Sequence, residues 1–192
     1  MSLNASRLDY WGGKLQAMGW LVIGRNARAE AVFDSMLARW PQDAYLLASR
    51  AHLLAQRGDC EAAIADAQAL VAAHPRRSAA DWFNLAYLFE DAKRYADAEP
   101  AFRQALELDP KLDRAWYGLG LTLIHLNRFD EAIAALKRNT ELQPMSPYGW
   151  YQMARVHMDR HEPDEARRII RHLQGFEPKV AAQLTRETGL AP

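Results

Sequence analysis

The chain has 192 residues, and its 24 lysines and arginines are balanced by 24 aspartates and glutamates, so the formal net charge at pH 7 is zero. A neutral chain lacks the long-range field that attracts nucleic acid or an anionic membrane surface, so neither partner is expected. No apolar run approaches the length of a membrane span, so membrane insertion is not expected either.

The cysteine count and the N-terminus bear on the cellular compartment. Cys60 is the single cysteine, so no disulfide can form within the chain, which agrees with a reducing cytosol. It occupies a turn position that Tyr95 and Phe129 fill elsewhere, and we interpret it as a small buried hydrophobe, not a reactive thiol. The N-terminus shows no basic segment followed by an apolar core. We expect a cytoplasmic protein, or a periplasmic one if a signal peptide has been removed.

Proline recurs along the chain at separations of 34, 35, 34 and 34 residues, at Pro41, Pro75, Pro110, Pro144 and Pro178. A fixed period of this length is typical of stacked helical repeats. It divides the chain into five units, at approximately residues 8–41, 44–75, 79–110, 113–144 and 147–178. Because each unit buries its apolar face only against its neighbours, we expect residues 1–192 to form one domain.

Aligning the units brings residues of similar size into register. Trp82, Trp116 and Trp150 share one column. Small residues occupy two further columns, one made of Ala17, Ala51, Ala86, Gly120 and Ala154 and the other of Ala29, Ala63, Ala98, Ala132 and Ala166. A bulkier column follows the second small one by four residues: Phe33, Ala67, Phe102, Leu136 and Ile170. Two helices approach closely only where side chains are small, so these columns predict where helices cross.

Each unit is predicted to be a helix–turn–helix hairpin. In the fourth unit, apolar residues follow i, i+3, i+4, i+7 spacing from Trp116 to Leu123. The breaks between helices fall at Gly24, Gly58 and Asn127, and Asp59, Asp97 and Asp130 are the expected N-caps of the second helices. Each closing proline lies past the second helix, which it cannot extend.

Two departures from the regular pattern need separate accounts. Pro100 falls inside a second helix, so we expect that helix to begin late, with Asp97 as its cap and Pro100 in its first turn. One extra residue lies between Pro75 and Trp82, and it should lengthen the loop there.

These landmarks resemble the tetratricopeptide repeat family. The best matches are residues 113–144, DRAWYGLGLTLIHLNRFDEAIAALKRNTELQP, and residues 81–110, DWFNLAYLFEDAKRYADAEPAFRQALELDP. The first unit matches mainly through Ala17, Ala29, Phe33 and Pro41. The resemblance extends over most of the chain. It implies an all-α fold: a right-handed superhelical array of five helical hairpins, with a C-terminal capping helix at residues 179–189.

In this family the first helices of successive hairpins line a concave groove, so the resemblance also implies a binding surface. The residues expected there are Lys14, Met18, His52, Phe83, Asn84, Tyr87, Arg114, Tyr117, Leu121, Tyr148, Tyr151 and Arg155. Aromatic residues on a surface are characteristic of protein-binding sites, although the rings could instead close over neighbouring helices. A groove of this width suits an extended peptide or one amphipathic helix.

One specific device of the family is not predicted: the clamp of Lys, Asn and Arg side chains that binds acidic C-terminal tails of heat-shock chaperones. Asn84 and Arg114 stand in matching places. However, Ala48, His52 and Gly118 stand where a lysine, an asparagine and a further basic residue are needed. Without these cations a tail carboxylate loses its charge-assisted hydrogen bonds.

Catalytic, metal and cofactor sites are not predicted. His157 and His161 have i, i+4 spacing, but the local sequence HMDRHE lacks the HExxH order, and His157 replaces core residues of other units. We interpret it as a packed or capping histidine. Arg167, Arg168 and Arg171 follow Asp164 and Glu165 at helical spacing, so a salt-bridged, solvated face is expected there.

The two ends of the chain differ. Val180 and Leu184 stand among polar residues near the C-terminus, as a capping helix requires. The N-terminal unit instead carries Leu8, Trp11, Leu15, Met18, Trp20 and Leu21. Either these side chains all pack against their own second helix, or some remain exposed and indicate self-association or docking.

Three functions are therefore considered. The favoured one is a non-enzymatic adaptor or scaffold that binds a peptide or helical segment of another protein in the groove. The alternative is a self-assembling structural module, a homodimer that docks through its apolar N-terminal repeat. The third is an accessory subunit or chaperone of a secretion or assembly system or of an enzyme complex.

Overall fold

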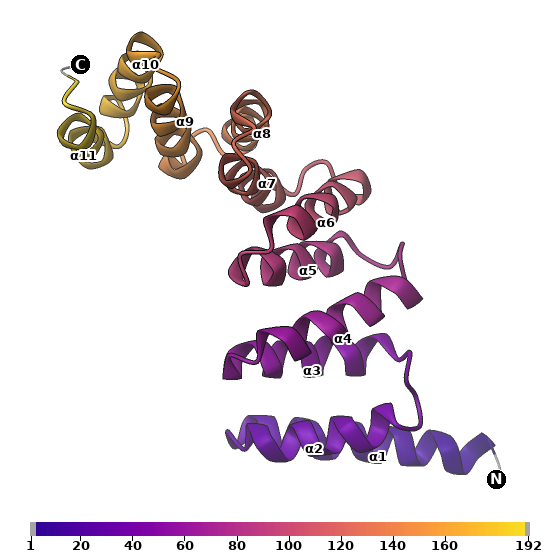
Figure 1. Ribbon diagram of the computed structural model, residues 1–192. Helices are drawn as coiled ribbons and strands as arrows, with labels where there is room; N and C mark the ends of the chain where they lie inside the picture. Colours follow the sequence, from indigo (N-terminus) through magenta and orange to yellow (C-terminus); the bar gives the residue numbers. More distant parts are fainter. Residues whose placement is uncertain (1–2, 191–192) are drawn as a thin grey trace. The chain divides into compact units, whose positions relative to one another are not determined.

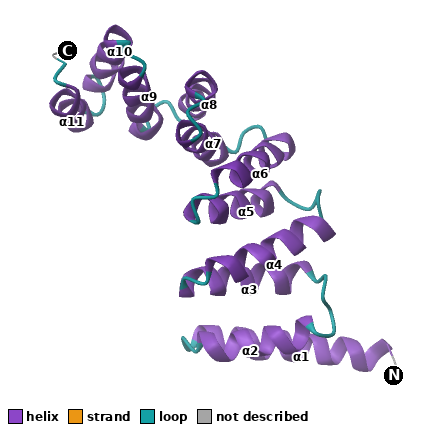
Figure 2. Ribbon diagram, viewed as in Figure 1, coloured by secondary structure: helices purple, strands orange, loops and turns teal. Residues whose placement is uncertain are grey.

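The computed structural model describes residues 3–190, and within that range every regular element is an α-helix and none is a strand (Figure 1; Figure 2). The helices are α1 (Leu3–Val22), α2 (Asn26–Leu37), α3 (Ala44–Arg57), α4 (Cys60–Ala73), α5 (Ala79–Asp91), α6 (Tyr95–Leu108), α7 (Asp113–His125), α8 (Phe129–Leu142), α9 (Pro147–Asp159), α10 (Pro163–Gln174) and α11 (Pro178–Thr188). The all-α class is confirmed, and the ten helices before α11 match the five predicted units in order.

The chain also divides into two larger compact units, each containing several repeats: the first unit is Met1–Ala92 and the second unit is Lys93–Pro192. The first contains α1 to α5 and the second contains α6 to α11. The boundary falls inside the third predicted hairpin, between α5 and α6. A single domain over the whole chain, which the unbroken period favours, remains a prediction.

The small-residue columns lie at the helix crossings. All five alanines of the second small column have no solvent exposure: Ala29, Ala63, Ala98, Ala132 and Ala166. In the first column, a Cβ added to Gly120 of α7 would lie 2.7 Å from Cγ of Leu136 in α8. The two helices are therefore too close for any larger residue there, which confirms the predicted crossing.

A hydrogen bond explains why tryptophan and proline recur together. The indole N–H of each column tryptophan donates to the carbonyl of the proline that closes the preceding unit: Trp82 to Pro75 at 2.8 Å, Trp116 to Pro110 at 2.9 Å and Trp150 to Pro144 at 3.2 Å. These carbonyls lie past the end of the second helix, where no helical N–H remains to bond them. The indole supplies that donor and joins each first helix to the preceding unit.

The turns inside the five hairpins share one backbone conformation. Each contains a residue with positive φ at the same column: Gly24 at 71°, Gly58 at 85°, Lys93 at 58°, Asn127 at 58° and His161 at 59°. Glycine adopts this left-handed region without steric cost, and asparagine tolerates it. Lys93 and His161 adopt it because the hairpin geometry requires it.

This turn overrides the predicted N-caps. Asp59 stands at the N-cap position of α4 without a side-chain cap bond, whereas Asp97 and Asp130 lie inside the first turns of α6 and α8. Their carboxylates pair with arginines instead: Asp59 with Arg57 at 3.0 Å, Asp97 with Arg94 at 2.8 Å and Asp130 with Arg160. Side-chain caps occur where α3 and α5 begin: Asp43 accepts from the amide of Leu46 at 2.9 Å, and Ser78 accepts from the amide of Ala80 at 3.0 Å.

The late start predicted for the helix around Pro100 is wrong. Helix α6 begins at Tyr95, so Pro100 lies in its interior and leaves the carbonyl of Ala96 without its helical donor. Both residues are exposed, and water can bond that carbonyl. The extra residue before Trp82 does lengthen a loop: residues 74–78 join α4 to α5, whereas four residues, 143–146, join α8 to α9.

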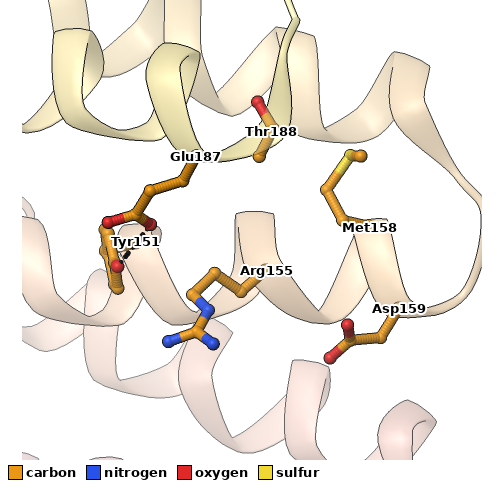
Figure 3. Close-up of a pocket in the computed structure, with 6 residues that line it drawn as sticks. All are labelled: Tyr151, Arg155, Met158, Asp159, Glu187 and Thr188. Carbon is orange, nitrogen blue, oxygen red and sulfur yellow. Dashed lines mark hydrogen bonds between the residues drawn. The ribbon is translucent and has the colours of Figure 1, made fainter.

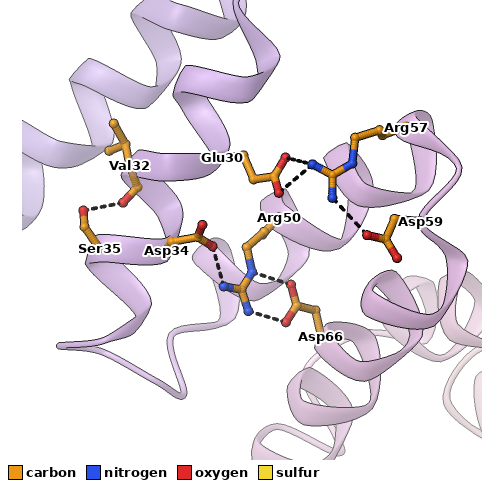
Figure 4. A network of polar contacts seen from close by, with 8 residues as sticks. All are labelled: Glu30, Val32, Asp34, Ser35, Arg50, Arg57, Asp59 and Asp66. Atoms are coloured by element: carbon orange, nitrogen blue, oxygen red, sulfur yellow. Dashed lines mark hydrogen bonds and ion pairs between the residues drawn. The ribbon is translucent and has the colours of Figure 1, made fainter.

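Two arginines of α3 hold the first unit together through ion pairs (Figure 4). Arg50 donates to both carboxylate oxygens of the buried Asp66, at 2.7 and 2.6 Å, and to Asp34 of α2 at 2.7 Å. These hydrogen bonds, the one to Asp66 above all, raise the pKa of Arg50. Arg57 binds Glu30 of α2 through two contacts of 2.9 and 2.8 Å. Helix α3 is thus fastened to both α2 and α4.

Candidate partner-binding surface

An aromatic pair joins two successive first helices in the second unit. Tyr117 of α7 and Tyr148 of α9 meet edge to face, with ring centroids 6.5 Å apart. Tyr148 is 68% exposed, and Tyr117 is half-buried beneath it. The pair therefore packs across the repeat junction and still presents aromatic surface to solvent.

Tyr151 extends this row to the last helix. Its hydroxyl donates to the carboxylate of Glu187 in α11 at 2.6 Å (Figure 3). The hydrogen bond raises the pKa of Tyr151, with burial adding to the effect, and together with a bond from Gln183 it lowers the pKa of Glu187. The directions of the two pKa shifts mean that this hydrogen bond favours the neutral phenol and the ionised carboxylate.

A shallow pocket of about 420 Å³ lies between α9 and α11 (Figure 3). Its lining consists of Tyr151, Arg155, Met158, Asp159, Glu187 and Thr188. The guanidinium of Arg155 lies 5.9 Å from the centre of the Tyr151 ring. The pocket thus combines one cation, two carboxylates, an aromatic ring and a thioether, a set that can hold both polar and apolar parts of a peptide.

The other two predicted residues of the second unit lie on α7. Arg114 is exposed one turn before Tyr117, and Leu121 is half-buried one turn after it. The second unit therefore carries six of the twelve predicted residues on two neighbouring first helices. Among these six, Tyr117 and Tyr148 are joined by a ring–ring contact, and Tyr151 and Arg155 by a cation–π contact.

The first unit carries the remaining predicted residues on α1, α3 and α5. The ammonium of Lys14 lies 3.6 Å from the centre of the Tyr45 ring and 5.3 Å from that of Trp11. This cation–π contact uses Lys14 in packing α1 against α3. Met18 is exposed, and the imidazole of His52 bonds the amide of Gln56 on its own helix at 2.9 Å.

Helix α5 carries an exposed aromatic side chain, Tyr87. Tyr87 is 57% exposed, Asn84 is exposed and Phe83 is half-buried. Glu90 lies one turn beyond Tyr87, where burial, and to a lesser degree the charge of Asp91, raises its pKa to about 7. This carboxyl therefore titrates near neutral pH beside an exposed aromatic ring.

Four lining residues of the pocket were not among the twelve predicted binding residues: Met158, Asp159, Glu187 and Thr188. Met158 and Asp159 lie one turn beyond Arg155, at the end of α9, so extending the expected face by one turn would have included them. Glu187 and Thr188 lie on the capping helix, and their contribution depends on how α11 docks against α9. The sequence predicts a capping helix through Val180 and Leu184, but no spacing indicates that Glu187 and Thr188 meet α9.

The residues considered for metal binding and for a basic surface make local contacts. Among residues 3–190, no group of three or more His, Cys, Asp and Glu side chains could hold a metal ion. His157 bonds Glu162 at 2.7 Å, as a packed histidine should, and Arg167 and Arg168 pair with Asp164 and Glu165, both at 2.7 Å.

Cys60 differs from its prediction, because it is half-buried and not fully buried. Its thiol lies 3.5 Å from the carboxylate of Asp91. Desolvation and this carboxylate raise its pKa, which favours the unreactive thiol. The described helices include none that is both long and apolar enough to cross a bilayer.

Helices paired in a fixed period, each pair packed on its neighbours, define a helical-repeat scaffold. Tetratricopeptide repeat models match residues 21–78, 48–113 and 90–151, which together cover more than half of the chain. The chain belongs to the tetratricopeptide repeat family.

Solved structures share this fold at low sequence identity. The MamA protein has a TM-score of 0.83 at 17% identity, over 96% of this chain and 97% of MamA. YrrB, a tetratricopeptide repeat protein with an unusual peptide-binding site, has a TM-score of 0.79 at 16% identity, over 88% of each chain. A tetratricopeptide repeat protein from Parabacteroides merdae has a TM-score of 0.81 at 19% identity, over 95% of this chain and 74% of its own. No functionally curated protein is similar enough in sequence to count as a relative.

Proposed function

We propose that this protein is a non-enzymatic adaptor, acting in the cytoplasm, that binds a peptide or helical segment of another protein on the face formed by the first helices of its second unit, α7 and α9. The observation that carries this proposal is the row Tyr148, Tyr117 and Tyr151, which leads to the pocket beside Arg155. Tyrosines that keep part of their surface in solvent, with an arginine beside one of them, supply large contact area at low entropic cost, and such residues dominate the energetics of protein interfaces.

The chemistry of the face indicates what kind of segment would bind. Arg155, Asp159 and Glu187 give the pocket charges of both signs, which suits a peptide with mixed polar groups. An acidic tail held by several cations is not favoured, because Gly118, at one of the positions that would need a basic residue, is buried against Phe102. The peptide-binding site of YrrB is consistent with peptide recognition on this fold.

A displayed library of random twelve-residue peptides tests the proposal without a known partner. Peptides selected on the wild-type protein are measured by calorimetry against the double variant Tyr148→Ala, Arg155→Ala. We expect the dissociation constant to rise at least tenfold, because truncating two interface anchors typically has an effect of this size. Circular dichroism should show unchanged helix content, since both residues are exposed.

The matched control carries the same number of truncations on second helices, Lys137→Ala on α8 and Arg168→Ala on α10, where both side chains are exposed. This control should bind the selected peptides as tightly as the wild type. Equal affinities for the double variant and the wild type would contradict binding on the first-helix face.

A further inference from the structure

Helix α1 is longer than the other first helices. Each of the four later ones begins three residues before the tryptophan column, at Ala44, Ala79, Asp113 and Pro147. The equivalent position in the first repeat is Tyr10, but α1 already begins at Leu3. The later first helices follow a proline by three or four residues, which limits extension backwards, and the first repeat has no such proline.

The outer face of α1 carries an apolar stripe. Its members follow alternating steps of three and four residues: Leu8, Trp11, Leu15, Met18 and Val22. Each exposes between 45% and 85% of its surface. Of the two expectations for the N-terminal repeat, the exposed one is therefore correct for these residues, while Trp20 and Leu21 pack towards α2. A repeat of this spacing is the pattern by which one helix packs along another.

Two glycines border this stripe, and nothing in the described chain uses the space that they leave. A Cβ added to Gly12 or Gly19 would meet no heavy atom within 4 Å. Other helical glycines mark close packing: a Cβ on Gly118 would lie 2.4 Å from Phe102, and one on Gly149 would lie 2.5 Å from Asn139. Glycine weakens a helix interior, and these two glycines leave open space in which a second backbone could approach α1 closely.

The same columns in the later repeats support this reading. The column of Gly12 is buried in every later first helix, at Leu46, Asp81, Ala115 and Gly149, as is that of Gly19, at Leu53, Leu88, Thr122 and Val156. A preceding second helix covers that face in each case. Leu15 and Val22 stand in columns that are polar or glycine in the later repeats, at Ser49, Asn84, Gly118 and Gln152 and at Gln56, Asp91, His125 and Asp159. The α1 face is thus more apolar than a repeat junction requires.

We propose that the outer face of α1 is a homodimer interface, on which α1 of a second copy lies antiparallel about a two-fold axis at Leu15. This inference goes beyond the proposed adaptor function and does not depend on it, because that function rests on residues of α7, α9 and α11. Met18, which was predicted for the groove, is assigned here to the dimer interface. In such an interface a contact from one residue to another is repeated in reverse. Leu8 then lies opposite the partner's Val22, and Trp11 lies beside the partner's Met18.

The stripe is complementary to itself in size as well as in polarity. With Leu15 on the axis, Gly12 faces the partner's Gly19, so the two backbones can approach on that side of the stripe. On the other side the indole of Trp11 and the thioether of Met18 fill the space, a contact that aromatic rings and sulfur favour. A generic apolar helix would need the same two glycines at the same spacing, which a second copy provides.

Charge and size also suit a second copy. No charged side chain lies within the stripe, and the formal net charge of zero means that two copies approach without mutual repulsion. A large apolar side chain buries roughly 60–120 Å² on full transfer from water. Five such side chains on each copy would bury on the order of 1,000 Å², the lower limit for a specific interface. We therefore expect a dimer of moderate, micromolar affinity.

Sedimentation equilibrium between 1 and 500 μM tests the proposal. The wild type should pass from its monomer mass of 21.8 kDa towards twice that value. Leu15→Glu should raise the dimer dissociation constant at least tenfold, because it places two carboxylates on the axis. The control Met145→Glu, at an equally exposed methionine in the column of Leu8, should leave the constant unchanged. A wild type that stays monomeric throughout, or a Leu15→Glu variant that dimerises equally well, would overturn the interface.

Cysteine cross-linking tests the register. In a Cys60→Ser background, Leu15→Cys should form a disulfide-linked dimer under mild oxidation at least tenfold faster than Met145→Cys in the same background. Equal rates would overturn the two-fold at Leu15 even if a dimer exists. Leu15→Glu should bind the selected peptides with wild-type affinity, so failure of this inference and failure of the proposed adaptor function are separate results.

Discussion

Helices α1 and α11 stand first and last in the chain, and the surfaces that they present to solvent differ in polarity. Helix α11 buries Ala181 and Leu184 in the core of the second unit and turns exposed polar residues such as Gln183 and Arg186 outward. Helix α1 buries Ala17 and exposes an apolar stripe on its other side. The two helices therefore differ in what they present to solvent: α11 covers its neighbours and shows polar residues, whereas α1 shows apolar ones.

The largest expected effect is on the free energy of unfolding, and it should appear at the buried Leu184 of α11 but not at the exposed Leu15 of α1. Leu184→Ser should lower the free energy of unfolding by about 3 kcal/mol or more, because it removes a fully buried side chain and buries a hydroxyl. Leu15→Ser should change it by less than about 0.5 kcal/mol in the monomer, since Leu15 is exposed. Urea unfolding followed by circular dichroism at 1 μM protein measures both. Similar losses in the two variants would show that α1 is packed within its own chain.

The next effect concerns glycine in α7 and α1. Gly118→Ala places a Cβ 2.4 Å from a ring carbon of Phe102, whose side chain is fully buried and cannot move aside. We expect a loss of about 1–3 kcal/mol from this overpacking. Gly19→Ala meets open space in the monomer and should stabilise α1 by about 0.5–1 kcal/mol. Thermal unfolding at low protein concentration should therefore shift in opposite directions, and a loss in both variants would contradict the open space beside Gly19.

The fold was largely predictable because the period of Pro41 to Pro178 and the alanine columns report packing directly. The details that failed are properties of the backbone. The left-handed turn before each second helix removes the need for Asp97 or Asp130 as a cap. An aspartate at these positions gives no sign of that turn. The greater length of α1 was also missed, because the sequence shows only that no proline precedes it.

The candidate surface was predictable where it lies on repeated columns, as at Tyr117, Tyr148 and Tyr151. It was not predictable where a different helix contributes. Glu187 reaches Tyr151 from 36 positions away, through the docking of α11 against α9. That docking depends on the burial of Leu184, and no repeated column places it.

The smallest expected effect tests the contact that joins α11 to the aromatic row. The hydroxyl of Tyr151, with Gln183, lowers the pKa of Glu187 below its ordinary value of 4.5. A carboxyl with a depressed pKa in the folded state stabilises it above that ordinary value, and this contribution is lost as the pH falls through the depressed pKa. Tyr151→Phe removes the hydrogen bond, so the variant should be less stable than the wild type at pH 6 and closer to it at pH 3. Urea midpoints at both pH values measure the difference. A gap that stays constant between them would show that the hydroxyl does not hold Glu187, and that α11 is retained by its apolar residues alone.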